Sequence, residues 1–108
     1  SRHELMTQLT GNLIRNAIRY NKKGGTVTVE LNYKKLVVAD TGIGIAPENM
    51  DKVFSRFFTV DKSHGGKNGG FGLGLAVCRK ICHRSGWRIS VESELGKGST
   101  FTVDFGLR

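Results

Sequence analysis

The sequence is poor in cysteine, and this scarcity excludes two ways of holding a small fold together. Only Cys78 and Cys82 occur in 108 residues, and they lie four apart in a segment with helical spacing. Two cysteines make no disulfide framework, and a structural zinc site needs four ligands. We therefore expect both to pack as small apolar or half-buried side chains, in a chain suited to a reducing compartment.

Long hydrophobic runs are also absent. No apolar stretch approaches the ~20 residues of a membrane-spanning helix, and no signal peptide is visible in the first residues. We expect a soluble chain, and a membrane-anchored parent protein would carry its anchor outside these residues.

Acidic residues are few, with 9 against 17 basic residues and a net charge of +8. A basic domain raises nucleic acid as a partner. The cations are scattered, however, and the single cluster of basic and aromatic residues is Arg56-Phe57-Phe58. The charge therefore favours a polyphosphate ligand or an acidic partner domain, and a nucleic-acid binder is a rival interpretation.

Glycine is abundant, with 15 residues, and most of the excess lies between positions 42 and 98. Such a distribution suits ligand loops, because glycine allows sharp turns and close approach of the backbone. The length predicts one domain, with enough residues to bury a core.

Hydrophobic periodicity predicts helices and strands in a defined order. Apolar positions recur at helical spacing in two long segments and alternate in four short ones. We expect helices at 4–20, about 47–54 and 73–85, half-buried or central strands at 26–31, 36–39, 88–94 and 99–105, turns at 32–35 and 96–98, and a mobile loop at about 59–71. This order predicts an α+β fold, a two-layer sandwich of a mixed, mainly antiparallel sheet with helices on one face.

Two asparagines in the first predicted helix form a candidate metal site. Asn12 and Asn16 lie at i and i+4, so both amides project from one face. An amide oxygen is a hard neutral ligand that suits Mg²⁺ held also by phosphate oxygens. The alternative is that both amides brace neighbouring backbone.

Asp40 ends a short apolar run and precedes Thr41-Gly42-Ile43-Gly44. An ionised carboxylate only accepts hydrogen bonds, and the exocyclic amino group of adenine donates them. The glycines allow the backbone to approach a base closely. The alternative is a simple Asx-turn at the end of a strand.

Glycines before the last predicted helix suggest a phosphate site. Gly70, Gly72 and Gly74 lead directly into this helix, where backbone N–H groups and the helix dipole attract anions. A second glycine turn, Gly96 to Gly98 followed by Ser99 and Thr100, reads in isolation as a hairpin turn.

Taken together, these segments resemble the ATP-binding catalytic domain of sensor histidine kinases, in the GHKL ATPase superfamily. The resemblance runs from about Leu9 to Phe105 and includes the phenylalanines 54, 57 and 58, which would hinge an ATP lid at about 59–71. It implies ATP and Mg²⁺ as cofactors. It places around the nucleotide Asn16, Tyr20, Asp40, Gly42, Gly44, Ile45, Phe58, Lys62, Gly70, Gly72, Leu73, Gly74, Leu75 and Thr100, with Asn12 and Arg19 catalytic and Asn12 and Asn16 at the metal.

Two positions depart from relatives in that superfamily. ATP-hydrolysing members carry a Glu where this chain has Asn12, and an amide cannot act as general base. In the lid, Arg is frequent at the positions of Thr59 and His64 and is absent from both, which leaves Lys62 and Lys67 as the lid cations. The chain therefore reads as a phosphoryl donor and not as an ATPase.

The resemblance implies that residues 1–108 are one catalytic domain cut from a longer two-component sensor kinase. Its γ-phosphoryl acceptor would be a histidine on a separate helical dimerisation domain, because His3-Glu4 lacks the proline expected at Gln8. A response regulator would follow as partner, with no nucleic acid. We expect a monomer in isolation, a homodimer when intact, and a cytoplasmic position in a membrane-anchored sensor. A regulator of the anti-sigma type, acting through protein binding, is the alternative.

Overall fold

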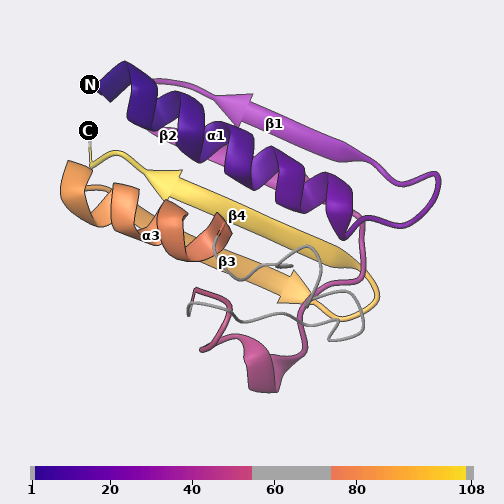
Figure 1. Cartoon of the computed structure of the whole chain (residues 1–108). Helices are drawn as coiled ribbons and strands as arrows, with labels where there is room; N and C mark the ends of the chain where they lie inside the picture. Colours follow the sequence, from indigo (N-terminus) through magenta and orange to yellow (C-terminus); the bar gives the residue numbers. More distant parts are fainter. Residues whose placement is uncertain (1, 55–73, 107–108) are drawn as a thin grey trace.

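The structure is a computed structural model and describes residues 2–54 and 74–106. Two helices lie side by side on one face of a four-stranded sheet, which confirms the predicted α+β sandwich (Figure 1). The elements in chain order are α1 (Arg2–Arg19), β1 (Val27–Leu31), β2 (Lys35–Asp40), the 3-10 helix η1 (Pro47–Asn49), α3 (Gly74–Ser85), β3 (Arg88–Glu94) and β4 (Gly98–Asp104). The predicted lid at 59–71, with Phe57 and Phe58, lies outside the described residues.

The sheet has the order β1-β2-β4-β3, and all three pairs of neighbours are antiparallel. The expected mixture with parallel pairing is therefore not seen among the described strands. Consecutive hairpins account for the β1–β2 and β3–β4 pairs, whereas β2 and β4 meet across a long connection that contains α3. This central pair brings the end of β2 next to the start of β4, where Asp40 lies opposite Ser99.

The core lies between the two helices and the central strands. Leu9 and Leu13 of α1 are fully buried, as are Leu36 of β2 and Val103 of β4. The i, i+4 spacing on α1 and the alternation along both strands bring these apolar groups into one layer. Among the described residues, no helix is both long and apolar enough to cross a membrane.

The first strand is more exposed than its alternating pattern predicts. Val29 is 44% exposed and Leu31 is 57% exposed, although both lie opposite residues of β2 that face the helices. The expectation of a half-buried strand is therefore wrong for most of β1. The reason is its position at the edge of the four strands, where α1 covers little of its inner face (Figure 1).

The predicted short helix at 47–54 is limited to Pro47–Asn49, followed by turns as far as Phe54. Its backbone bonds join residues three apart, such as Lys52 N–H to the Asn49 carbonyl at 2.9 Å, so no α-helical turn forms. Apolar contacts fix the segment instead. Val53 is fully buried, and the ring of Phe54 meets that of Phe101 edge to face at 6.2 Å between centroids.

The two cysteines of α3 are buried, in agreement with the sequence analysis. Burial raises the pKa of Cys78 to about 12, and the neighbouring Cys82 adds to the increase, while a hydrogen bond with Asn12 and the charge of Arg15 oppose it. Burial likewise raises the pKa of Cys82 to about 11. A thiol is nucleophilic only as thiolate, so both groups are inert at neutral pH.

We therefore expect a thiol reagent such as DTNB to leave Cys78 and Cys82 unlabelled in the native chain at pH 8. Both should react within minutes after unfolding in guanidinium, because the unfolded thiols regain an ordinary pKa of ~8.5. Rapid labelling of the native chain would contradict the burial and protonation of this pair.

Candidate functional site

Asp40 stands at the end of β2 and turns its carboxylate back onto the backbone. Its Oδ1 accepts hydrogen bonds from the N–H of Gly42 at 2.9 Å and of Ser99 at 3.3 Å. The first bond is the Asx-turn considered as the alternative from sequence. Among the described residues both bonds go to Oδ1, so Oδ2 stays available to a ligand.

The environment of Asp40 disfavours its charge. Burial raises the pKa of Asp40 above its ordinary value, and the two backbone N–H groups only partly oppose this effect. A half-buried carboxylate with one free oxygen is a strong hydrogen-bond acceptor, because few waters compete for it. Such an acceptor suits the amino group of a base, as the sequence predicts.

The loop after Asp40 is held between the end of α1 and the turn that joins β3 to β4. Ile43 N–H donates to the carbonyl of Tyr20 at 3.0 Å, and the carbonyl of Ile43 accepts from Gly96 N–H at 2.8 Å. Two glycines make this seating possible. A Cβ on Gly42 would collide with the carbonyl of Tyr20, and Gly44 has φ 73°, in the left-handed region.

Thr41 fastens the same loop on its other side. Its hydroxyl accepts from Thr26 N–H at 2.8 Å and donates to the side chain of Asn21 at 3.1 Å. The amide of Asn21 in turn donates to the carbonyl of Thr26 at 2.9 Å. The end of α1, the start of β1 and the Asp40 loop are therefore one hydrogen-bonded unit.

The structure does not bring Thr100 to the side of the sheet that carries Asp40. Thr100 lies opposite Ala39, so the two side chains share the open face, away from the helices. Ser99 lies opposite both Asp40 and Ser93, and it is buried. Sequence reasoning missed both serines. The alternation along β4 could have revealed Ser99, because Phe101 and Val103 face the core and Ser99, two residues before Phe101, lies on the same face.

Tyr20 and Ile45 flank the loop as buried side chains, 8% and 1% exposed. Tyr20 follows α1 directly, and the Arg19 guanidinium lies 5.7 Å from the centre of its ring. Arg19 itself is exposed. A basic group therefore stands beside the predicted base pocket, on the surface at the end of α1.

The two asparagines of α1 have different surroundings. Oδ1 of Asn12 accepts a hydrogen bond from the guanidinium of Arg15, and the Asn12 side chain opposes the rise in the pKa of the Cys78 thiol on α3. Asn16 is half-buried, and within the described residues no hydrogen bond to its side chain is present. Of the two amides, Asn16 is therefore the one open to a further partner.

The start of α3 is only partly described. Gly74 opens the helix and has open space around its Cα, and Leu75 is buried in the core. The other residues predicted for the nucleotide on this side lie outside the described residues: Phe58, Lys62, Gly70, Gly72 and Leu73. In the described part, no cluster of three or more His, Cys, Asp or Glu side chains could hold a metal.

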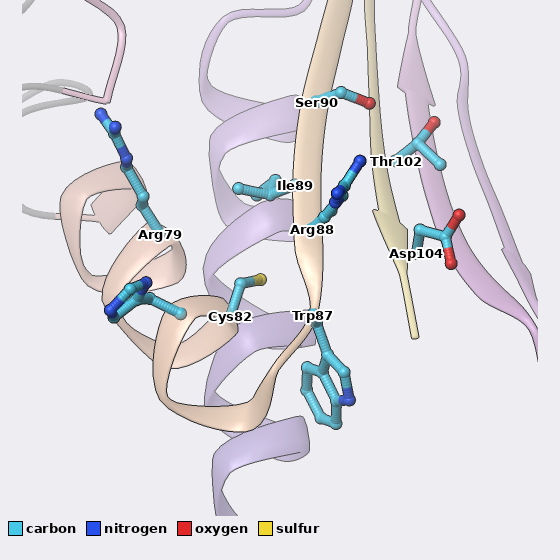
Figure 2. Close-up of a pocket in the computed structure, with 9 residues that line it drawn as sticks. Arg79, Cys82, Trp87, Arg88, Ile89, Ser90, Thr102 and Asp104 are labelled. Atoms are coloured by element: carbon cyan, nitrogen blue, oxygen red, sulfur yellow. The ribbon is translucent and has the colours of Figure 1, made fainter. Parts of the chain in front are cut away.

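A separate hollow of about 490 Å³ follows the outer edge of β3, at the opposite end of the sheet from Asp40. Figure 2 shows that Cys82 and Ile89 lie on its helix side, while Arg88, Ser90 and Asp104 lie on the open face of the sheet. None of the predicted site residues lines it. The hollow wraps a strand edge and is distinct from the Asp40 site.

The chain belongs to the family of histidine kinase-, DNA gyrase B- and HSP90-like ATPases, whose sequence pattern matches residues 2–108. The hydrogen-bond acceptor at the end of β2, in a glycine-containing loop beside α1, therefore belongs to a chain of this ATPase family. Sequence and structure comparisons both indicate the histidine kinase branch.

The sensor histidine kinase RppB of Synechocystis is 44% identical over 100 residues, which cover 89% of this chain and 22% of RppB. A solved structure of the mycobacterial sensor histidine kinase MprB superimposes with a TM-score of 0.73 at 26% identity, covering 93% of this chain and 68% of MprB. Full-length ShkA, solved in complex with AMPPNP, superimposes with a TM-score of 0.73 at 30% identity, covering 92% of this chain and 20% of ShkA. The chain spans about a fifth of the curated relatives.

Replacing Asp40 by Asn should weaken ATP binding while sparing the fold. The amide oxygen keeps the two backbone bonds, but an NH₂ group replaces Oδ2 and would meet the adenine amino group donor to donor. One mispaired buried group costs ~1–3 kcal/mol, or roughly tenfold to a hundredfold in affinity. Calorimetry with ATP measures this loss.

Thermal unfolding of the same variant has an expected sign. The raised pKa means that the protonated form of Asp40 is favoured by folding and that its charged form, present at pH 7, costs stability, so removal of this charge should leave stability at pH 7 unchanged or raised. Asp104→Asn is the matched control, because Asp104 also accepts an N–H two residues on, from Gly106, but is exposed. Equal ATP affinity for both variants would remove Asp40 from the site.

Proposed function

We propose that this chain binds Mg-ATP with the adenine at Asp40 and donates the γ-phosphoryl group to a histidine on a separate helical dimerisation domain. The observation that carries the proposal is the half-buried carboxylate of Asp40, whose second oxygen is engaged by no described residue, in a member of this ATPase family. The buried residues Tyr20 and Ile45 would line the base pocket.

One residue of α1, Asn16, has the chemistry of a magnesium ligand. Asn16 offers an amide oxygen that no described residue engages, on the same helical face as Tyr20. The oxygen of Asn12 already faces the cation of Arg15, which disfavours a second cation there. We therefore assign the ligand role to Asn16. Magnesium bound there would neutralise phosphate charge.

Two further features of the described residues would hold the phosphates. Arg19 is an exposed cation at the end of α1, and the first backbone N–H groups of the 12-residue helix α3 offer an anion site. Lys62, Gly70, Gly72, Leu73 and Phe58 keep their predicted roles around the nucleotide.

Transfer to a protein acceptor is favoured over hydrolysis. Asn12 stands where hydrolysing relatives have a general base, and an amide bonded to Arg15 takes no proton from water. Phosphoryl transfer depends mainly on positioning and charge neutralisation, which the proposed groups supply. The acceptor histidine would come from another domain.

We propose further that the chain is one domain of a longer two-component sensor kinase, in line with its span of about a fifth of the curated relatives. The intact kinase would be a homodimer with its catalytic domain in the cytoplasm and a membrane anchor elsewhere. Its phosphorylated histidine would supply a cognate response regulator. The ShkA complex with AMPPNP supports an adenine nucleotide as the ligand.

Replacing Asn16 by Ala removes an oxygen and adds no charge. We expect ATP affinity in the presence of Mg²⁺ to fall roughly tenfold, as for one lost hard ligand or hydrogen bond to a charged group, and affinity in EDTA to stay unchanged. Calorimetry under both conditions makes the comparison. Gln8→Ala is the control, an exposed amide on the same helix. An equal loss with and without Mg²⁺ would assign Asn16 to the nucleotide or the fold, and not to the metal.

The 108-residue chain alone should hydrolyse ATP very slowly, because it has neither a general base nor an acceptor. The helical domain of the parent kinase, added with [γ-³²P]ATP, should acquire label that is stable to alkali and labile to acid. Asp40→Asn should lower this labelling at subsaturating ATP. Rapid steady-state hydrolysis by the chain alone would overturn the donor proposal and favour an ATPase.

A further inference from the structure

The hydroxyl of Ser93 makes three hydrogen bonds near the C-terminal end of β3. Ile45 N–H donates to it at 2.8 Å, and it donates to the carbonyl of Gly98 at 2.9 Å. Its third partner is the hydroxyl of Ser99, with 2.8 Å between the oxygens. Ser93 therefore joins the loop after Asp40 to the strand that supplies Ser99.

Either serine could donate in the bond between them, and one direction is compatible with all three contacts of Ser93. A serine hydroxyl has one hydrogen and two lone pairs. The hydrogen of Ser93 goes to the carbonyl of Gly98, and one lone pair receives Ile45 N–H. Ser93 is then left with one lone pair, so we assign Ser99 as the donor. With its hydrogen used in this way, Ser99 faces any other partner as an acceptor only.

Ser99 lies next to Asp40 in the same row across the sheet. The two residues are directly opposite in the β2–β4 pair, which sets their Cβ atoms ~5 Å apart, and the row continues to Ser93 on β3. The base end of the site thus holds two neighbouring acceptors, the carboxylate of Asp40 and the hydroxyl of Ser99. Two acceptors suit an exocyclic amino group, which has two N–H donors, and repel a carbonyl oxygen.

We propose that Ser93 is a positioning residue for base selection, because it fixes Ser99 as an acceptor and so favours 6-amino over 6-oxo purines. The inference rests on the proposed placement of adenine at Asp40. Without the Ser93 hydroxyl, the Ser99 hydroxyl is free to rotate and to donate to a 6-oxo group. Selectivity then falls, although Ser93 itself touches no nucleotide.

The test compares ATP with inosine triphosphate, which carries an oxygen in place of the 6-amino group. Calorimetry on the 108-residue chain with Mg²⁺ gives the ratio of the two dissociation constants. We expect the unmodified chain to favour ATP at least tenfold, and Ser93→Ala to lower this ratio by about tenfold, the effect of one hydrogen bond. Ser90→Ala is the matched control on β3, because Ser90 is exposed on the open face (Figure 2), and its ratio should not change.

A double-mutant cycle tests whether Ser93 acts through Ser99. Ser99→Ala should lower the ratio by a similar factor, and adding Ser93→Ala should lower it no further. Ser93→Cys keeps the approximate volume with a weak hydrogen-bonding group, so it supplies the measurement if Ser93→Ala does not fold.

Three outcomes would overturn the inference: equal weakening of both nucleotides by Ser93→Ala, an additive loss in the double variant, or no preference for ATP in the unmodified chain. The first would show a purely structural role. Failure of the proposed function is distinguishable, since there the unmodified chain binds neither nucleotide or Asp40→Asn binds ATP normally.

Discussion

The site depends on how firmly one short loop, residues 41–46, is held at the end of β2. Backbone bonds join it to the carbonyl of Tyr20, directly after α1, on one side and to the β3–β4 turn on the other, and Ser93 adds a side-chain bond. These contacts connect segments more than 20 residues apart in the chain. The proposed base pocket would therefore form only when the helix layer and the central strands have already docked, which ties the proposed ligand binding to the folded state.

The same arrangement lowers folding stability at Asp40 while it prepares the carboxylate for the proposed ligand. Burial raises the pKa of the carboxylate, so the folded chain without ligand holds this proton more readily than the unfolded chain does. By linkage, the contribution to stability is greatest below the unfolded pKa and is lost as pH rises through the folded one. At neutral pH the charge is therefore a local cost, which a donor from the ligand offsets. Sites that bind polar groups commonly sacrifice stability in this way.

The sequence was sufficient where local pattern and packing agree. The two long helices, the glycine loop after Asp40 and the strand ends follow from spacing, to within one or two residues. It was insufficient where long-range pairing decides. The order β1-β2-β4-β3, the exposure of β1 and the partner of Asp40 depend on which strands meet. A one-residue choice of parity separates Thr100 from Ser99, and alternation from Phe101 would have resolved it. The length of the short helix was wrong because Pro47 can open a helix but does not determine how far it continues, and only Pro47–Asn49 is helical.

The helix α1 arranges the predicted groups in a line. Asn12, Asn16 and Tyr20 follow one another at four-residue steps, each a rise of ~6 Å, so one face leads from the base pocket past the metal candidate to the pairing of Asn12 with Arg15. This pairing makes position 12 a poor place for a general base, in keeping with the proposed role of the chain as a phosphoryl donor. A carboxylate introduced there would lie beside the guanidinium, which would lower its pKa and weaken it as a base. Asn12 is bonded to Arg15, and beside it the thiol of Cys78 on α3 reaches the carbonyl of Leu9 on α1. With its oxygen engaged by Arg15, the Asn12 amide takes no proton from water, so under the proposed function it supplies no general base for hydrolysis.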